Sequence, residues 1–466
     1  MRKIILAVIC TIVLAAPTAL AQGTLSAAQK AKIDDAVAAV LASTGAPSAS
    51  VAVVWDGAIA YERAYGSARL APPTPATPLM RYSIGSVSKQ FTATAILLLA
   101  EEKRLSLDDK VSRWLPDLTR ADEVSIRQLL SMTAGYQDYY PQDYVFTAMR
   151  GPATSRTILD TWARKPLDFE PGTKWQYSNT NYVIAGLIVE RASGVPLFEF
   201  LQKRIFTPLG MTSAKDIDVG PLGSGDAAGY IRNALGPLRL TPKEGSGWLF
   251  AAGQLAMTAH DLALWDISMI KQTLLQPSSY REMQTEVRVT NGVAVGYGLG
   301  VRVGSAGGRR EISHGGAVSG YLTSNVVYPD DRAAIVVFSN IYPGAASPEG
   351  AIAQRIAAAL KPVDPDATKA LELAKSMFVG LQKGTIDRSL LSANASDYFT
   401  AEVLSDFASS LGPLGAPTEF VQTATNLRGG MTFRGFRVKC GGRVVEVTMR
   451  VLPDGRIEQY LVERAE

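Results

Sequence analysis

Ser86 and Lys89 stand three residues apart in the run Ser83-Ile84-Gly85-Ser86-Val87-Ser88-Lys89, just before the almost wholly apolar stretch 92–100. On one turn of helix, residues three apart share a face, so the lysine amine can reach the serine hydroxyl. A serine becomes a strong nucleophile when a neighbouring base takes its proton, and a lysine serves as that base when burial lowers its pKa. The spacing alone also fits a helix cap followed by a surface lysine. The pair therefore predicts chemistry only in combination with other residues.

Two further stretches could complete a cleft around this pair. Tyr177-Ser178-Asn179 follows a turn-forming segment, and a phenol and a carboxamide two residues apart on a loop can both point into one cleft. Ser313-His314-Gly315-Gly316-Ala317 lies at a predicted strand edge, where adjacent glycines let a ligand approach the backbone closely. A solvated loop and an ordinary bulge are the alternative interpretations of these stretches.

The elements that would position these side chains follow from periodicity and turn signals. Residues 26–44 predict an amphipathic helix, and Asp56-Gly57 predicts a hairpin between strands 50–55 and 58–64. Short helices and loops after residue 105 form a mainly helical insertion. Later strands are predicted at 299–303, 309–313, 325–328 and 333–339, followed by a helix at 350–360. The fold class is therefore α/β of the α+β kind, an antiparallel sheet flanked by helices plus a mostly helical subdomain.

A second, smaller domain follows a stiff, proline-containing linker. The chain has 466 residues, 47% of them hydrophobic, which is more than one small core needs. Helices at 371–381 and 400–411 precede glycine-separated strands with alternating apolar residues, so the C-terminal unit is a small α+β domain. Its order of elements resembles the nuclear transport factor 2 fold. The predicted boundaries are 1–21 for a signal peptide, 22–361 for the main domain, 362–368 for the linker and 369–466 for the C-terminal domain.

The N-terminus and the composition limit where the protein acts and with what. Met1-Arg2-Lys3, an apolar stretch over 4–16 and Ala19-Leu20-Ala21 predict a secretory signal peptide, so the protein is expected to be exported, periplasmic or secreted, with no transmembrane anchor after cleavage. The chain contains two histidines and two cysteines, and only Cys440 would remain after cleavage, so neither a disulfide nor a Cys/His metal cluster is expected. A net charge of +4 without a basic run makes nucleic acid an unexpected partner.

Together, Ser86-Val87-Ser88-Lys89, Tyr177-Ser178-Asn179 and His314-Gly315-Gly316 resemble the signature elements of the serine β-lactamase and penicillin-binding protein family. The branch is the one that contains class C β-lactamases, D-alanyl-D-alanine carboxypeptidases, D-aminopeptidases and related esterases. The resemblance extends from about the first helix to Leu360, and it implies a β-lactamase/transpeptidase-like fold for residues 22–361.

The resemblance also implies a role for each motif residue. Ser86 would be the acylated nucleophile, Lys89 its proton-transfer partner and Tyr177 the acid or base that relays a proton to the leaving group. Asn179 would hydrogen-bond the acyl side of the substrate, and His314, Gly315 and Gly316 would border the cleft. The oxyanion hole would consist of the backbone N–H groups of Ser86 and Ala317. No cofactor or metal is required.

Departures from the family pattern bear on the substrate. Class C β-lactamases usually carry Lys-Thr-Gly where this chain has His314-Gly315-Gly316, and a histidine offers no permanent cation for a substrate carboxylate. The frequent tract Leu-Leu-x-His-Thr-Ser-Gly appears as Leu129-Leu130-Ser131-Met132-Thr133-Ala134-Gly135, without its histidine and serine.

The function predicted from the sequence is that of an exported serine hydrolase that forms an acyl-enzyme on Ser86 and cleaves an amide or ester. The favoured substrate is a small molecule or peptide containing a D-amino acid, as in a D-alanyl-D-alanine carboxypeptidase or a D-aminopeptidase. Within the same family, the alternatives are a carboxylesterase and a β-lactamase. A non-catalytic sensor that binds peptidoglycan or β-lactams is the alternative of another class. The oligomeric state does not follow from the sequence.

Overall fold

The computed structural model describes residues 23–142, 144–306, 308–343, 346–360 and 366–464. The predicted signal peptide (1–21) and most of the predicted linker (362–368) lie outside the described residues. The chain divides into two compact units between Leu360 and Lys361. Each unit is described below by itself.

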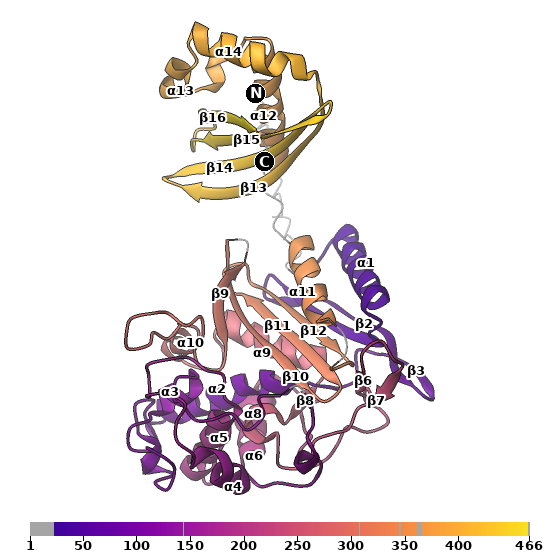
Figure 1. Cartoon of the computed structure of the whole chain (residues 1–466), viewed down its shortest axis with the longest axis vertical. Coiled ribbons are helices and arrows are strands. Elements are labelled where there is room, and N and C mark those ends of the chain that lie inside the picture. The colour runs from indigo at the N-terminus through magenta and orange to yellow at the C-terminus, as the bar shows by residue number, and fades with distance from the viewer. Residues whose placement is uncertain (1–22, 143, 307, 344–345, 361–365, 465–466) are drawn as a thin grey trace, which may run out of the picture. The chain divides into compact units, whose positions relative to one another are not determined.

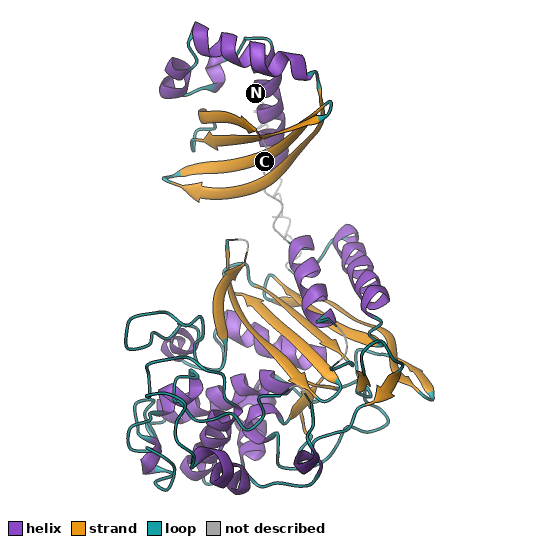
Figure 2. Ribbon diagram, in the orientation of Figure 1, coloured by secondary structure: helices purple, strands orange, loops and turns teal. Residues whose placement is uncertain are grey.

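A seven-stranded, wholly antiparallel sheet forms the centre of the first unit, as Figure 2 shows. Its strands are, in spatial order, β3 (Pro73–Pro75), β2 (Ala58–Leu70), β1 (Ser48–Trp55), β12 (Ala333–Ser339), β11 (Tyr321–Tyr328), β10 (Arg309–Val318) and β9 (Arg302–Ala306). The central strand β12 is buried at every position, because helices cover both faces of the sheet there. This confirms the predicted antiparallel sheet flanked by helices.

Helices α1 (Ala27–Thr44) and α11 (Pro348–Ala359) pack on one face of this sheet and form a separate apolar cluster with β1 and β12. Ser26 and Gln29 make the predicted capping box at the start of α1. Helix α9 (Ala259–Lys271) lies against the opposite face, where the larger core begins (Figure 1). The apolar stripe of each helix therefore has a sheet face to cover.

The mostly helical subdomain packs against that larger core and carries Ser86 and Lys89. Its helices are α2 (Ser88–Glu101), α3 (Ile126–Leu130), α4 (Ser155–Ile158), α5 (Asn179–Ser193), α6 (Leu197–Leu201), α7 (Thr207–Leu209), α8 (Phe250–Gly253) and α10 (Pro277–Met283). Two small sheets join it to the rest, one of β4 (Tyr82–Ser83), β8 (Leu255–Met257) and β5 (Lys215–Asp216), the other of β6 (Tyr230–Arg232) and β7 (Leu238–Leu240). Residues 88–99 of α2 are buried throughout.

The strand predicted at 299–303 begins further along the chain than expected, because β9 starts at Arg302. Gly300 has a φ of +76°, and a Cβ on it would lie 2.9 Å from the carbonyl oxygen of Lys89. The chain therefore turns at Gly300 while packed against α2, and the strand starts after the turn.

The second unit contains helices followed by an antiparallel meander, the order that the sequence predicts. Its helices are α12 (Ala367–Gln382), α13 (Ala393–Tyr398) and α14 (Ala401–Leu411), and its strands are β13 (Pro417–Arg428), β14 (Met431–Cys440), β15 (Arg443–Val451) and β16 (Ile457–Arg464). Val447 and Met449 alternate with exposed-face residues and pack against Phe378 of α12 in a core of their own. The resemblance to the nuclear transport factor 2 fold remains a prediction.

Candidate active site

Ser86 lies in a single 3₁₀ turn, η1 (Gly85–Val87), that continues directly into α2, so Lys89 occupies the first turn of α2. Gly85 has a φ of +48°, and a Cβ on it would lie 3.0 Å from the amide nitrogen of Ala317. Glycine therefore meets two demands at this position, a left-handed turn and a close approach of β10. The turn aims Ser86 into a cavity of ≈ 460 Å³ that Ala317 also lines.

The amine of Lys89 is fully buried beneath this cavity. Its Nζ lies 3.0 Å from Ser86 Oγ, 2.8 Å from Asn179 Oδ1 and 2.8 Å from the carbonyl oxygen of Ala252. Burial lowers the pKa of Lys89 to about 7, and the charge of Asp138 opposes this shift in part. The amine therefore changes protonation state near neutral pH.

A neutral lysine has two N–H groups and one lone pair, and its three neighbours match this set. The oxygens of Asn179 and Ala252 can only accept hydrogen bonds, so the two N–H groups point to them. The lone pair then remains for the Ser86 hydroxyl. This arrangement is suited to taking a proton from Ser86.

Tyr177 approaches the same pair from the segment before α5. Lys89 Nζ lies 5.0 Å from the centre of the Tyr177 ring. A hydrogen bond with Ser86 lowers the pKa of Tyr177, but burial raises it by more, so the phenol keeps its proton at neutral pH. The Ser86 hydroxyl thus lies within hydrogen-bonding range of both Lys89 and Tyr177, as the motifs predict.

Asn179 begins helix α5, whereas the sequence interpretation placed it on a loop. Its Oδ1 accepts from Lys89, and its Nδ2 and backbone N–H donate to Asp138 Oδ1 at 3.1 and 2.9 Å. Burial raises the pKa of Asp138, while the backbone N–H groups of Tyr140 and Asn179 and the charge of Lys89 lower it in part. Asn179 therefore links Lys89 to an acid at the wall of the cavity.

Sequence reasoning did not single out Asp138. The sequence feature that could have identified Asp138 is its place shortly after the tract 129–135. That tract was considered only because it lacks the histidine and serine of the family pattern. In place of that histidine, the sulfur of Met132 accepts weakly from the backbone N–H of Ser178 at 3.4 Å and from Asn181 Nδ2 at 3.9 Å. The hydrogen bonding of this wall is therefore retained in a weaker form.

His314 is 3% exposed and is not among the residues that line the cavity. Its Nδ1 lies 2.6 Å from the carbonyl oxygen of Gly315, which can only accept, so Nδ1 carries the proton and Nε2 accepts from the hydroxyl of Tyr297 at 2.9 Å. Burial lowers the pKa of His314 to about 3, and the charges of Lys89 and Arg302 act in the same direction. His314 is thus a neutral side chain behind the strand edge, with its ring centre 6.2 Å from that of Tyr177.

Gly315 and Gly316 differ in their surroundings. Gly316 is buried against the loop that precedes Ser86, whereas Gly315 is exposed on the other face of β10. Neither glycine is among the residues that line the cavity, but Ala317, one residue further on, is. Of the residues predicted to bind substrate, Asn179 and Ala317 therefore reach the cavity directly.

The described ranges contain neither a metal-ligand cluster nor a helix suited to span a membrane. In those ranges no three His, Cys, Asp or Glu side chains gather so as to hold a metal ion. None of the helices described there has the length and hydropathy of a membrane span.

The buried lysine contacts a serine, a tyrosine and an asparagine where a helical subdomain meets an antiparallel sheet. This arrangement is typical of the class of penicillin-recognising serine enzymes. The Beta-lactamase family model matches residues 33–360, and the chain belongs to that family.

Its relatives include hydrolases and a penicillin-binding protein. Penicillin-binding protein 4* of Bacillus subtilis is 30% identical over 61% of this chain and 66% of its own length. A D-aminopeptidase of Brucella anthropi is 31% identical over 64% of this chain and 57% of its own length. The chain thus covers less than two thirds of the length of both relatives. The crystal structure of a D-stereospecific amidohydrolase from Streptomyces sp. is similar with a TM-score of 0.61 and 26% identity, over 71% of this chain and 97% of that one.

Proposed function

We propose that the protein is an exported serine hydrolase that cleaves amides and peptides of D-amino acids through an acyl-enzyme on Ser86. The observation that carries this proposal is the contact of a fully buried Lys89 with Ser86 Oγ at 3.0 Å, with the other two contacts of its amine made to carbonyl-type oxygens. The similarity to a D-aminopeptidase and a D-stereospecific amidohydrolase supports the choice of substrate class.

In the proposed reaction, Ser86 Oγ attacks the scissile carbonyl carbon while its proton passes to Lys89. The backbone N–H groups of Ser86 and Ala317 stabilise the oxyanion that develops on the carbonyl oxygen. Tyr177 then delivers a proton to the leaving amine as the carbon–nitrogen bond breaks, and the proton that Lys89 took from Ser86 passes to Tyr177 in its place. Water hydrolyses the resulting ester of Ser86 in the second half of the cycle, with the same groups moving its proton.

The charges around the cavity favour a substrate with a free amino group. Among the described residues that line it, Asp138 is the acid and there is no lysine or arginine. A substrate ammonium next to Asp138 would gain a charge-assisted hydrogen bond and would favour the ionised carboxylate. A substrate carboxylate at the same place would meet like charge. We therefore place the protein with aminopeptidases and amidases rather than with carboxypeptidases or β-lactamases.

The test compares D-alanine p-nitroanilide with its N-acetyl derivative, which lacks the ammonium. We expect kcat/KM to favour the free amine by at least ~10-fold, the lower range for one hydrogen bond to a charged group. Asp138→Asn should lower both rates, because Asp138 holds Asn179, and should also remove most of the preference. L-Alanine p-nitroanilide and a cephalosporin are the controls for substrate class, and Ser86→Ala is the blank. Faster turnover of the cephalosporin than of either anilide would refute the proposal.

A further inference from the structure

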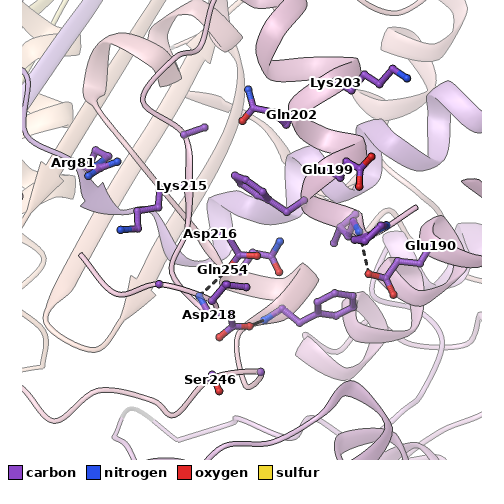
Figure 3. Close-up of a pocket in the computed structure, with 18 of the residues that line it drawn as sticks. Arg81, Glu190, Glu199, Gln202, Lys203, Lys215, Asp216, Asp218, Ser246 and Gln254 are labelled. Carbon is purple, nitrogen blue, oxygen red and sulfur yellow. Dashed lines mark hydrogen bonds between the residues drawn. The ribbon is translucent and has the colours of Figure 1, made fainter. Parts of the chain in front are cut away.

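A second cavity of the first unit does not contain Ser86. It measures ≈ 1350 Å³ and is drawn in Figure 3. Helix α8 separates the two cavities. Its residues Ala252 and Gly253 line the cavity at Ser86, whereas Phe250, at the start of α8, and Gln254, directly after its end, line the larger cavity. The larger cavity is therefore distinct from the proposed active site.

An unsatisfied carboxamide lies in this cavity. Gln254 is 2% exposed, and its side chain has no hydrogen-bond partner among the residues that the structure describes. The polar atoms of this amide are not among the fully enclosed atoms without a partner, so they face the cavity, where a polar group supplied from outside can bind them. Figure 3 shows the Gln254 amide beside Asp216.

The pairing of strand β5 with strand β8 brings Asp216 close to Gln254 at the cavity wall. β5 pairs with β8 so that Asp216 is opposite Leu255, and the backbone N–H of Ile217 donates to the carbonyl oxygen of Gln254. One carboxylate oxygen of Asp216 accepts from the backbone N–H of Asp218 at 2.9 Å. Burial raises the pKa of Asp216, while the backbone N–H groups of Asp218 and Val219 lower it in part.

Glu199 adds a second carboxylate to the cavity wall, Glu190 accepts from the backbone N–H of Leu197 at 3.0 Å, and the remaining charged groups have partners or point elsewhere. The Asp218 carboxylate accepts from the backbone N–H groups of Leu249 and Phe250. Lys215 Nζ donates to the carbonyl oxygen of Pro221 at 2.9 Å, and Arg81 forms a two-fold hydrogen bond with Asp226 outside the cavity. Lys203 points away from Asp216 in Figure 3.

Apolar side chains make up much of the remaining wall, among them Phe198, Phe250, Leu197, Pro196 and Val219. A cation close to aromatic rings gains a further attraction from their faces. The cavity thus combines a small polar end, with a carboxylate and an amide oxygen as acceptors, and a larger apolar wall.

We propose that this cavity binds an apolar primary amine, held as its ammonium ion by Asp216 and the side-chain oxygen of Gln254, with its hydrocarbon part against the apolar wall. An ammonium supplies the donors that both acceptors lack, which an anion cannot do. A neutral alcohol could supply one donor but would not compensate the Asp216 charge. The site is separate from the acylation chemistry, so the proposal does not depend on the proposed function.

The experiment measures binding of 2-phenylethylammonium to the full chain by isothermal titration calorimetry. We expect a site that persists in Asp138→Asn, and at this site at least ~10-fold weaker binding of the neutral analogue 2-phenylethanol and of the variant Asp216→Asn. Gln254→Met, which keeps the length of the side chain, should also weaken binding and serves as a second variant if Asp216→Asn does not fold. Glu286→Gln, outside the cavity, is the control for a general charge effect and should bind as the wild type does.

A second comparison separates this cavity from the one at Ser86. Asp138→Asn should retain the wild-type affinity for 2-phenylethylammonium, because Asp138 lies on the other side of α8. Loss of binding in Asp138→Asn with retention in Asp216→Asn would place the amine in the Ser86 cavity and overturn the proposal. Equal affinity for the amine and the alcohol, or no detectable binding of the amine, would overturn it as well.

Discussion

Gly316 faces the carbonyl oxygen of Ile84 so closely that a Cβ on Gly316 would lie 2.0 Å from that oxygen. Ile84 precedes the turn that carries Ser86, and Gly316 lies on β10, one residue before Ala317. Because Gly316 has no side chain, strand β10 and the turn that carries Ser86 can approach each other closely and border one cavity. This contact sets the separation between the two N–H groups of the proposed oxyanion hole.

We expect Gly316→Ala to push β10 away from the Ser86 turn and to lower kcat/KM by at least ~10-fold, with a loss of stability of roughly 1–3 kcal/mol, as for other overpacked sites. Gly315→Ala is the matched control, because the nearest atom to its Cβ would be the carbonyl oxygen of Thr323 at an ordinary 3.8 Å. Steady-state kinetics and thermal unfolding of both variants test this. Equal activities of the two variants would contradict the positioning role.

The pKa of Lys89 makes a prediction about pH. Burial lowers that pKa to about 7, and only the neutral amine can accept the Ser86 proton. The rate constant for acylation of Ser86 by a fluorophosphonate should therefore rise about tenfold per pH unit below pH 7 and level off above it. Rapid-mixing measurements between pH 5.5 and 9 give this profile. Lys89→Arg stays protonated and should lose at least ~10²-fold at every pH. A rate independent of pH in the wild type would exclude Lys89 as the base.

Tyr177 is expected to act through its hydroxyl. Tyr177→Phe should lower turnover by at least ~10²-fold without loss of fold, the lower end of what a positioned acid or base contributes. Tyr182 is the matched control, since its ring also faces Lys89, with Nζ at 5.5 Å, but its hydroxyl donates to the carbonyl oxygen of Leu130. Tyr182→Phe should affect stability more than rate. Full activity of Tyr177→Phe in both acylation and deacylation would remove it from the mechanism.

Short-range patterns in the sequence were sufficient to predict that Ser86 and Lys89 lie side by side. The three-residue spacing of Ser86 and Lys89 acts within one turn of helix, and the meeting with Tyr177 followed from a family resemblance. The antiparallel sheet followed from hairpin signals that also act over a few residues. These features depend on local geometry, so sequence distance is a good guide to them.

The contacts that tune the site were not predictable in the same way. Asp138, the carbonyl group of Ala252 and the hydroxyl of Tyr297 meet their partners Asn179, Lys89 and His314 through tertiary packing. The cavity behind α8 also depends on such packing, because the pairing of β5 with β8 joins segments about 40 residues apart in the sequence. No periodicity or motif specifies which backbone carbonyl will face a buried amine.

Asp266 allows a last prediction, about stability. It is fully buried, and Asn325 Nδ2 donates to its two oxygens at 2.8 and 2.9 Å, while Asn325 Oδ1 accepts from Gln90 Nε2 at 2.9 Å. Burial raises the pKa of Asp266 well above its usual value. In the unfolded chain this carboxyl ionises near pH 4, so above that pH the folded state binds more protons than the unfolded state. The free energy of unfolding should therefore fall as the pH rises from about 4 to the folded-state pKa, by up to about 1.4 kcal/mol per pH unit from this group.

Asp266→Asn replaces the carboxyl group by an uncharged group of the same shape and should remove this contribution. We expect the variant to be more stable than the wild type at pH 7 and close to it at pH 4, where the wild-type carboxyl is protonated in the folded state and about half protonated in the unfolded chain. Urea unfolding of both proteins at several pH values between 4 and 8 measures the difference. The acylation rate of Ser86 is the control for an intact site, since Asp266 touches none of the reacting groups. A constant difference in unfolding free energy across this pH range would show that Asp266 does not titrate in the way its burial requires.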